Sequence, residues 1–239
     1  MSNHDPFFEP YDRDSIAYGI VPSAPLAAYL SQVECSGRAI DLGAGGGRDT
    51  LALADAGFEV TAVDLSGRGL QRIEQRASNL GLLERITFLE GDVREVDITP
   101  AAYSAVVATT VLDHVPSDDA REVWERMTAA LRPDGCLYIE VHTTEDPGSF
   151  KQPGLESDAP VSETASAVIN YFEPNQLVAW ALEPASKLRV LRYEERLEWD
   201  YTHGDEHLHG KAVLLAVHEG HHPCWYGQPP AFPRREPQS

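Results

Sequence analysis

A glycine-rich turn is the part of the sequence with the clearest chemical meaning. It follows the short apolar stretch 39–42 and contains Gly43, Gly45 and Gly47. Because glycine has no Cβ, Gly43 and Gly45 allow the backbone to approach a ligand closely. The N–H groups at the start of a following helix can bind an anionic group such as a carboxylate. The turn therefore predicts a ligand-binding loop between a strand and a helix.

Two acidic residues follow at positions that suit a nucleoside. Asp64 ends the next expected strand, at the distance of about 20 residues that is usual for a carboxylate that binds ribose hydroxyls. Asp92 follows the third expected strand. Arg48 stands where a dinucleotide fingerprint needs a small third residue for close packing of helix and strand. A nicotinamide-dependent oxidoreductase is therefore the weaker alternative.

The candidates for proton transfer are four histidines, His114, His142, His207 and His209, because a neutral imidazole can accept a proton near pH 7. His142 follows an expected strand, at the carboxyl edge where ligands bind in open α/β sheets. His207 and His209 alternate onto one face just before the last expected strand, and Glu195 lies on the neighbouring one. We expect Glu195 to orient one of these imidazoles, and we expect His142, His207, His209 and Glu195 to be catalytic.

The histidine-rich segment near the C-terminus also allows a zinc interpretation, because imidazoles and a thiolate can form a tetrahedral site. Its members are His203, His207, His209, His218, His221, His222 and Cys224. Their spacing matches no known zinc finger. A magnesium site through Asp113 with Glu145 or Asp146 lacks the usual order of acidic ligands. The sequence therefore assigns no metal site.

The elements that position these residues alternate between strand and helix. Expected strands lie at 39–42, 58–64, 86–89, 105–108, 136–141, 188–199 and 212–217, and expected helices begin near Thr50, Ser66, Ser117 and Glu173. Near-continuous apolar strands indicate burial on both faces, as in parallel sheets. We therefore predict a doubly wound, Rossmann-like α/β sheet of seven strands, with helices on both faces and a late antiparallel hairpin.

One domain is expected over residues 1–239, which is an ordinary domain size. Its expected parts are an N-terminal leader or cap (1–37), a cofactor-binding core (38–142), a Pro-rich and acidic candidate lid (143–168), an acceptor-side completion of the sheet (169–218) and a Pro-rich tail (219–239). No sequence feature predicts an oligomeric state.

Composition limits the partners. The net charge of −19 disfavours nucleic acid and anionic membranes, because both carry negative charge themselves. No apolar run approaches the roughly 20 residues that span a bilayer, and the first residues lack a signal-peptide pattern. Three cysteines without a C-x-x-C pair fit free thiols in a reducing compartment. We therefore expect a cytoplasmic protein.

The ordered motifs resemble the class I S-adenosylmethionine-dependent methyltransferases over about residues 38–142. They are found at 41–47, 63–64, 91–92, 109–114 and 131–135. A narrower likeness, at 18–22, 47–54, 193–195 and 207–209, is to the small-molecule group that includes tellurite-resistance and thiopurine-type enzymes. The chain has Asp49 where many tellurite-resistance members have Asn, so the acceptor is left open.

The resemblance implies which residues bind the methionine part of S-adenosylmethionine. Gly43, Ala44 and Gly45 are expected to wrap around it. Asp41 is expected to orient its ammonium group, directly or through water, and Thr109 to approach the same group from the fourth strand.

The resemblance likewise implies an adenosine site. Asp64 is expected to bind both ribose hydroxyls and Asp92 to accept a hydrogen bond from the adenine amine. Leu65 and Val93 would form the apolar walls of the adenine slot, and Tyr11 and Tyr18 would close over the cofactor from the leader.

The implied activity is in-line transfer of a methyl group to a small molecule: a thiol, a chalcogen oxyanion, or an oxygen or nitrogen of a natural product. For such a displacement a protein mainly supplies proximity and a dry pocket. The alternative from another class is a regulatory protein that binds the cofactor without turnover.

Overall fold

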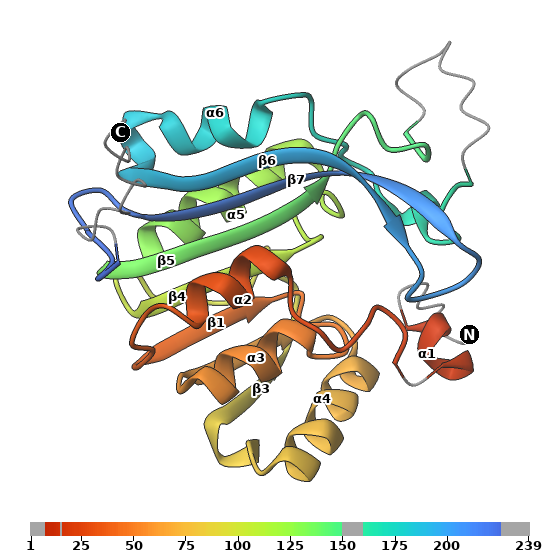
Figure 1. Cartoon of the computed structure of the whole chain (residues 1–239), viewed down its shortest axis with the longest axis horizontal. Coiled ribbons are helices and arrows are strands. Elements are labelled where there is room, and N and C mark those ends of the chain that lie inside the picture. Colours follow the sequence, from red (N-terminus) through yellow and green to blue (C-terminus); the bar gives the residue numbers. More distant parts are fainter. Residues whose placement is uncertain (1–7, 15, 150–159, 226–239) are drawn as a thin grey trace, which may run out of the picture.

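A single seven-stranded sheet runs through the computed structural model, which describes residues 8–14, 16–149 and 160–225 (Figure 1). The strands are β1 (Arg38–Leu42), β2 (Glu59–Asp64), β3 (Ile86–Glu90), β4 (Tyr103–Thr109), β5 (Leu131–His142), β6 (Leu188–Asp200) and β7 (His207–His218). Their spatial order is β3-β2-β1-β4-β5-β7-β6. The first five strands are parallel, and β7 is antiparallel to both β5 and β6. The predicted fold class is confirmed.

Helices cover both faces of the sheet. They are α1 (Glu9–Arg13), α2 (Ala24–Leu30), α3 (Arg48–Ala56), α4 (Gly67–Leu80), α5 (Ser117–Ala130) and α6 (Gln176–Leu182), with 3-10 turns η1 (Leu83–Arg85), η2 (Ala165–Ala167) and η3 (Pro184–Ser186). Helices α2, α3 and α4 pack on one face, and α5 and α6 contribute to the core on the other. None of these helices is both long and apolar enough to cross a membrane.

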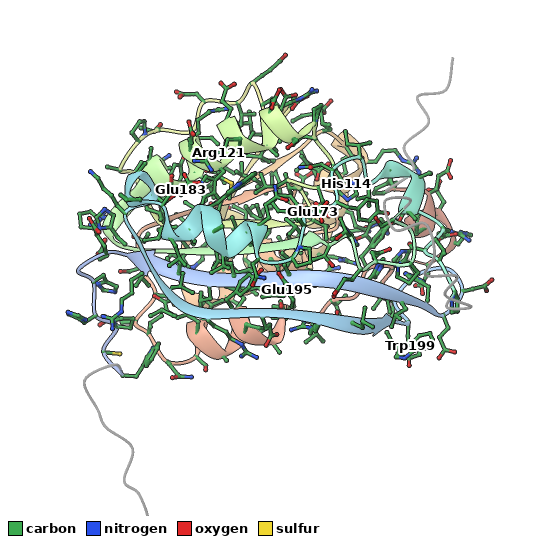
Figure 2. All side chains as sticks on the ribbon, turned by 90° about the horizontal axis from the view of Figure 1, so that it is seen from above. His114, Arg121, Glu173, Glu183, Glu195 and Trp199 are labelled. Carbon is green, nitrogen blue, oxygen red and sulfur yellow. The ribbon has the colours of Figure 1, made fainter. Side chains whose placement is uncertain are left out.

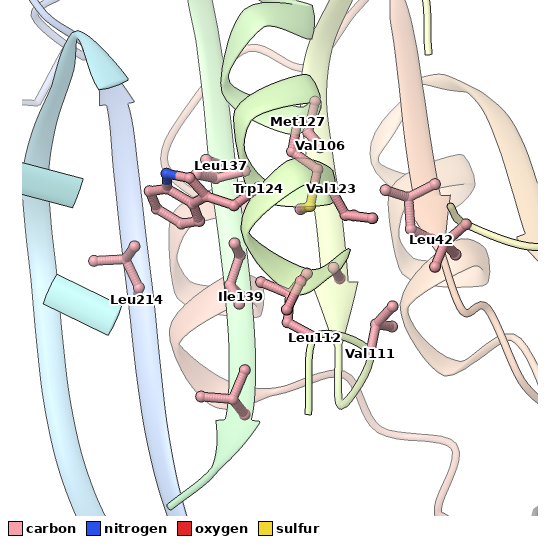
Figure 3. Close-up of a cluster of buried hydrophobic side chains, with 14 of the residues drawn as sticks. Leu42, Val106, Val111, Leu112, Val123, Trp124, Met127, Leu137, Ile139 and Leu214 are labelled. Atoms are coloured by element: carbon pink, nitrogen blue, oxygen red, sulfur yellow. The ribbon is translucent and has the colours of Figure 1, made fainter. Parts of the chain in front are cut away.

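Successive side chains along each strand point to opposite faces of the sheet and so pack into two different layers of the core. Ile40 joins the layer under α5 and α6, whereas its neighbour Ala39 joins the layer under α2, α3 and α4. Trp124 of α5 is fully buried against β5 and β7, as Figure 3 shows, and its indole N–H donates to Ser186 Oγ at 3.3 Å. The core thus fixes the strands whose ends carry the site.

Local signals for α4 act as the sequence predicted. Ser66 caps the first turn by accepting a hydrogen bond from the Gly69 N–H at 3.2 Å. Gly81 ends the helix with a left-handed backbone, at φ +72°.

The topology brings β5, β6 and β7 together at one edge. Because β7 runs antiparallel to β5, its first residues lie beside the carboxyl end of β5, with His142 opposite Lys211. Strand β6 ends beside the start of β7, with Asp200 opposite His207. The strand expected at 212–217 begins at His207, so the two histidines lie inside the sheet. Of the candidate lid, residues 150–159 lie outside the described part of the chain, as do residues 226–239 of the tail.

Candidate functional site

The glycine turn after β1 has the backbone that its sequence predicts. Gly43, Gly45 and Gly47 have φ values of +68°, +52° and +86°. A Cβ at Gly43 would clash with Val111, whereas a Cβ at Gly45 would find no atom within 4 Å. The Ala44 N–H donates to the Val63 carbonyl at 2.9 Å. The loop is therefore tightly packed at Gly43 and open at Gly45, which fits a loop that a ligand approaches.

Asp64, at the end of β2, is tied to this loop. Its Oδ2 accepts the Gly45 N–H at 2.7 Å, and its Oδ1 accepts the Ser66 N–H at 2.7 Å. A carboxylate offers about four acceptor positions, enough for these backbone donors and for sugar hydroxyls together. Asp64 thus lies where a ribose-binding residue is needed.

A buried pair of carboxylates lies beneath the loop. Asp41 accepts a hydrogen bond from the Thr50 hydroxyl, while Asp49 is paired with Arg48 at 2.9 Å and accepts the Thr109 hydroxyl at 2.9 Å. Burial, together with the charge of Asp49, raises the pKa of Asp41 to about 8. Asp41 is thus mostly protonated in the free protein at neutral pH, and a bound cationic group such as an ammonium would favour its ionised form. Thr109 reaches this region through Asp49, a partner that the sequence did not indicate.

The predicted adenine residues are spread more widely. Asp92 forms an ion pair with Arg94 at 2.5 Å, and the hydrogen bond from Arg94 lowers the pKa of Asp92. Val93 is buried, whereas Leu65 is 69% exposed. An apolar side chain that is covered only when a ligand binds would be exposed in this way. The adenine roles of Asp92, Val93 and Leu65 stay predictions.

Two tyrosines of the leader take different places. Tyr11 lies against the glycine loop. Its ring is so close to Gly46 that a Cβ on this residue would clash with it. The ring of Tyr18 instead packs on that of His203, with 4.3 Å between the ring centroids. The backbone N–H of Tyr18 donates to the Thr202 carbonyl at 3.2 Å. Tyr18 also lies against Tyr11, with 5.3 Å between the ring centroids, so closure of the two tyrosines over the cofactor stays a prediction.

His142, at the end of β5, is held by a buried aspartate. Asp113 Oδ2 lies 2.5 Å from His142 Nδ1 and also accepts the His142 backbone N–H at 2.9 Å. Burial would raise the pKa of Asp113, but His114 and the hydrogen bonds from His142 lower it to about 2. Asp113 is therefore an anion at neutral pH, and it fixes the orientation of the His142 ring.

His207 and His209 are also buried, and together with His142 they form a histidine cluster. The ring of His209 lies 4.7 Å from that of His142, and the Nε2 atoms of His207 and His209 are 3.1 Å apart. His209 Nδ1 is 2.9 Å from Asp146 Oδ2. The structure thus brings His142, His207 and His209 together, with the ring of His114 6.0 Å from that of His142, and adds Asp146 to them.

Glu195 does not join these histidines. It pairs in register with Ala212, in the middle stretch of β6 (Figure 2), and its Oε1 accepts the Asn175 N–H and the Tyr193 hydroxyl. The expected pairing of Glu195 with an imidazole is wrong. Asp113 and Asp146 take the orienting role instead.

A cleft of about 460 Å³ adjoins the cluster. Its lining includes Ala17, Glu163, Thr202, His203 and Asp205. The His203 ring is 4.7 Å from that of His207, and burial lowers the pKa of His203 to about 4, so this ring is neutral at pH 7. The cleft thus borders the histidines through His203, while His142, His207 and His209 are buried behind it.

Sequence reasoning missed the carboxylates that organise this cluster: Asp113, Asp146 and Asp200. Asp113 and Asp146 were considered only as magnesium ligands. The signal that could have found them is their position, because Asp113 follows β4, Asp146 follows β5 and Asp200 ends β6. These strand ends meet at one edge of the sheet.

Comparison with known proteins places the chain among methyltransferase-like sequences. Residues 39–135 match the family model described as a methyltransferase domain. The carboxy-S-adenosyl-L-methionine synthase of Chromohalobacter salexigens is 34% identical over 155 residues, which are 58% of this chain and 56% of that protein. The putative methyltransferase YqeM of Bacillus subtilis is 31% identical over 131 residues, or 52% of each protein. The chain spans about half the length of these curated relatives.

A solved structure extends the likeness of the fold beyond the matched domain. TehB from Haemophilus influenzae superposes with a TM-score of 0.67 at 16% identity, covering 90% of this chain and 68% of that one. At this identity the likeness concerns the fold.

Proposed function

We propose that this chain, which over residues 39–135 belongs to the methyltransferase domain family and has the class I fold, transfers a methyl group from S-adenosylmethionine to a small molecule. The observation that carries the proposal is the hydrogen bond from the Gly45 backbone N–H to the Asp64 carboxylate. It joins the carboxylate expected to bind ribose to an open glycine loop at the carboxyl edge of the sheet.

The residues at this edge fit the cofactor. Gly43, Ala44 and Gly45 would hold the methionine part, Asp49 would attract its ammonium group, and Asp41 would lose its proton as that group binds. Thr109 would act through Asp49, since its hydroxyl donates there. When bound, S-adenosylmethionine supplies an electrophilic methyl group on a sulfonium.

The adenosine part would lie along the ends of β2 and β3. Asp64 would accept the ribose hydroxyls, and Asp92 would accept from the adenine amine. Val93 and Leu65 would cover the ring, and burying the exposed Leu65 side chain would favour binding.

On the acceptor side, we propose that His142 accepts the proton of an O–H, N–H or S–H acceptor, while His207 and His209 complete the pocket wall. The Asp113 carboxylate orients His142 and stabilises its protonated form. Aligning the acceptor with the methyl group and excluding water supply the remaining rate enhancement.

The substrate class follows from the surroundings of the cluster. The 460 Å³ cleft suits a small molecule, and the net charge of −19 disfavours a nucleic acid or an anionic membrane. We also propose a cytoplasmic location, because Cys35, Cys136 and Cys224 are unpaired, as is usual in a reducing compartment.

The test is turnover. Purified protein is incubated with S-adenosylmethionine and a panel of thiols, selenium and tellurium oxyanions, phenols and amines, and mass spectrometry follows S-adenosylhomocysteine and methylated product. We expect both to form in equal amounts with at least one acceptor class. Cofactor binding without product from any class would favour the regulatory alternative.

A further inference from the structure

Two ring nitrogens face each other in the buried cluster at the β6–β7 edge. We propose that His207 Nε2, His209 Nε2 and the carboxylate of Asp200 bind a divalent first-row transition-metal ion of the Zn²⁺ type. The three ligand atoms lie within 4.8 Å of one another. Two histidines and one carboxylate are an established ligand set for such ions.

The hydrogen bonds of the two rings leave lone pairs pointing at one another. His207 Nδ1 lies 2.6 Å from the Asp205 carbonyl oxygen, and His209 Nδ1 lies 2.9 Å from the Asp146 carboxylate. Both partners are acceptors, so both Nδ1 atoms must carry the hydrogen. In neutral rings both Nε2 atoms are then acceptors, although they are 3.1 Å apart. A cation between them resolves this conflict.

The distances fit a shared ion. Two nitrogens bound at about 2.0–2.1 Å to one ion are about 3 Å apart at a right angle and about 3.4 Å apart at the tetrahedral angle. The observed 3.1 Å lies between these values. Asp200 Oδ2 is 3.8 Å from His209 Nε2. Two ligand atoms of one tetrahedral ion are about 3.3 Å apart, so the Asp200 side chain must move toward the ion to bind it.

The outer partners have the arrangement that metal sites use. A metal-bound histidine usually donates its other N–H to a carboxylate or a backbone carbonyl, which fixes its tautomer and orientation. Here Asp146 and the Asp205 carbonyl do so. Asp146 is itself held by the N–H groups of Gly148 and Gly210, at 2.7 and 3.1 Å. The site is therefore organised before an ion arrives.

The surroundings leave room for a further ligand. The three proposed protein ligands leave one position of a tetrahedral ion open, and His203, whose ring is 4.7 Å from that of His207, lines the neighbouring 460 Å³ cleft. Three protein ligands and an open position are typical of a catalytic rather than a structural zinc site.

One consequence rests on the proposed methyl transfer. An ion at this place would bind an anionic or easily ionised acceptor, such as a thiol or an oxyanion, close to His142. His207 and His209 would then act as ligands, and His142 would remain the proton acceptor. Metal binding itself does not depend on methyl transfer, and the two are measured separately.

The test is a titration of chelator-stripped full-length protein with Zn²⁺ in competition with a chromophoric chelator. We expect one ion per chain, at least 100-fold weaker binding in both His207→Ala and His209→Ala, and a 10- to 100-fold loss in Asp146→Asn. His218→Ala, at the other end of β7, is the matched control and should bind like the wild type. Circular dichroism and S-adenosylmethionine binding check that each variant is folded.

Nitrogen NMR of the histidine rings gives a second readout. With the ion, both Nε2 resonances of His207 and His209 should shift and both Nδ1 atoms should keep their hydrogens. Failure to bind Zn²⁺, equal binding by wild type and both histidine variants, or an imidazolium whose signals Zn²⁺ leaves unchanged would each overturn the proposal. Loss of S-adenosylmethionine binding with retained Zn²⁺ binding would instead count against the proposed function alone.

Discussion

Asp113 contacts His142 twice through one oxygen: its Oδ2 lies 2.5 Å from the ring Nδ1 and accepts the backbone N–H at 2.9 Å. The carboxylate is fully buried, and His114 and His142 hold its pKa at about 2 against the effect of burial. The pair thus joins the residue after β4 to the end of β5 and fixes one imidazole at the acceptor side.

Asp113→Asn should lower turnover while S-adenosylmethionine binding stays unchanged. The amide keeps the shape of the side chain but loses the charge that orients and stabilises the protonated ring, so we expect kcat to fall at least about 10-fold. Steady-state kinetics and calorimetric titration of the same preparation check this. A variant with full kcat would remove His142 from the proposed proton transfer.

Asp41→Asn should stabilise the free protein at alkaline pH. The folded-state pKa of about 8 lies above the unfolded value near 4, so the folded protein binds the extra proton and wild-type stability falls as the pH rises from about 4 to 8. The amide does not titrate. Its advantage over the wild type should therefore grow between pH 5 and pH 8 by at least about 1 kcal/mol, or about 2–4 °C in Tm.

Thermal unfolding at the two pH values measures this difference. Asp55→Asn, on the exposed side of α3, is the control and should show no such trend. An advantage of Asp41→Asn that is equal at both pH values would contradict the raised pKa. The same variant should bind S-adenosylmethionine more weakly, because the amide cannot lose a proton and become the anion that a bound ammonium group would favour.

Gly45→Ala should weaken cofactor binding far more than it destabilises the fold. Gly45 has φ +52° and space for a Cβ, so the cost to the fold is the left-handed backbone alone, about 1–2 kcal/mol. A bound methionine group would meet the new methyl group, and we expect at least a 10-fold loss of affinity.

Gly81→Ala is the matched control for the backbone strain. Gly81 also has a positive φ, of +72°, and also has space for a Cβ, but it ends α4 away from the loop. The Tm of the Gly81→Ala variant should fall about as much as that of Gly45→Ala, while the affinity of Gly81→Ala for S-adenosylmethionine should not change. Equal affinities of the two variants would show that the ligand does not approach Gly45.

The sequence predicted the regular part of the fold because each signal there is local. Apolar runs mark the parallel strands, and Ser66 and Gly81 mark the two ends of α4. The glycine loop and Asp64 were predictable for the same reason, since they lie within one strand-turn-helix-strand unit.

The acceptor side could not be predicted in the same way because it depends on strand register. A bulge between Val190 and Arg192 and the turn that joins β6 to β7 set which residues face each other. Glu195 therefore lies opposite Ala212, and Asp200 lies opposite His207. The carboxylates that hold the histidines come from three separate elements, and no local spacing links them.

Asp64→Ala should weaken binding of S-adenosylmethionine by about 1–3 kcal/mol, or roughly 5- to 150-fold. The change removes the charged acceptor of the ribose hydroxyls and the anchor of the Gly45 N–H. Calorimetric titration measures the ratio of affinities, with Asp55→Asn as a control that should match the wild type. Unchanged affinity would contradict the ribose assignment.

The central claim is tested most directly by calorimetric titration of the wild-type protein with S-adenosylmethionine and S-adenosylhomocysteine, with NADH as the control ligand. Binding of either adenosyl compound in the micromolar range, with no heat from NADH, is the predicted result. Binding of NADH alone, or of neither adenosyl compound both before and after Zn²⁺ is restored, would contradict it.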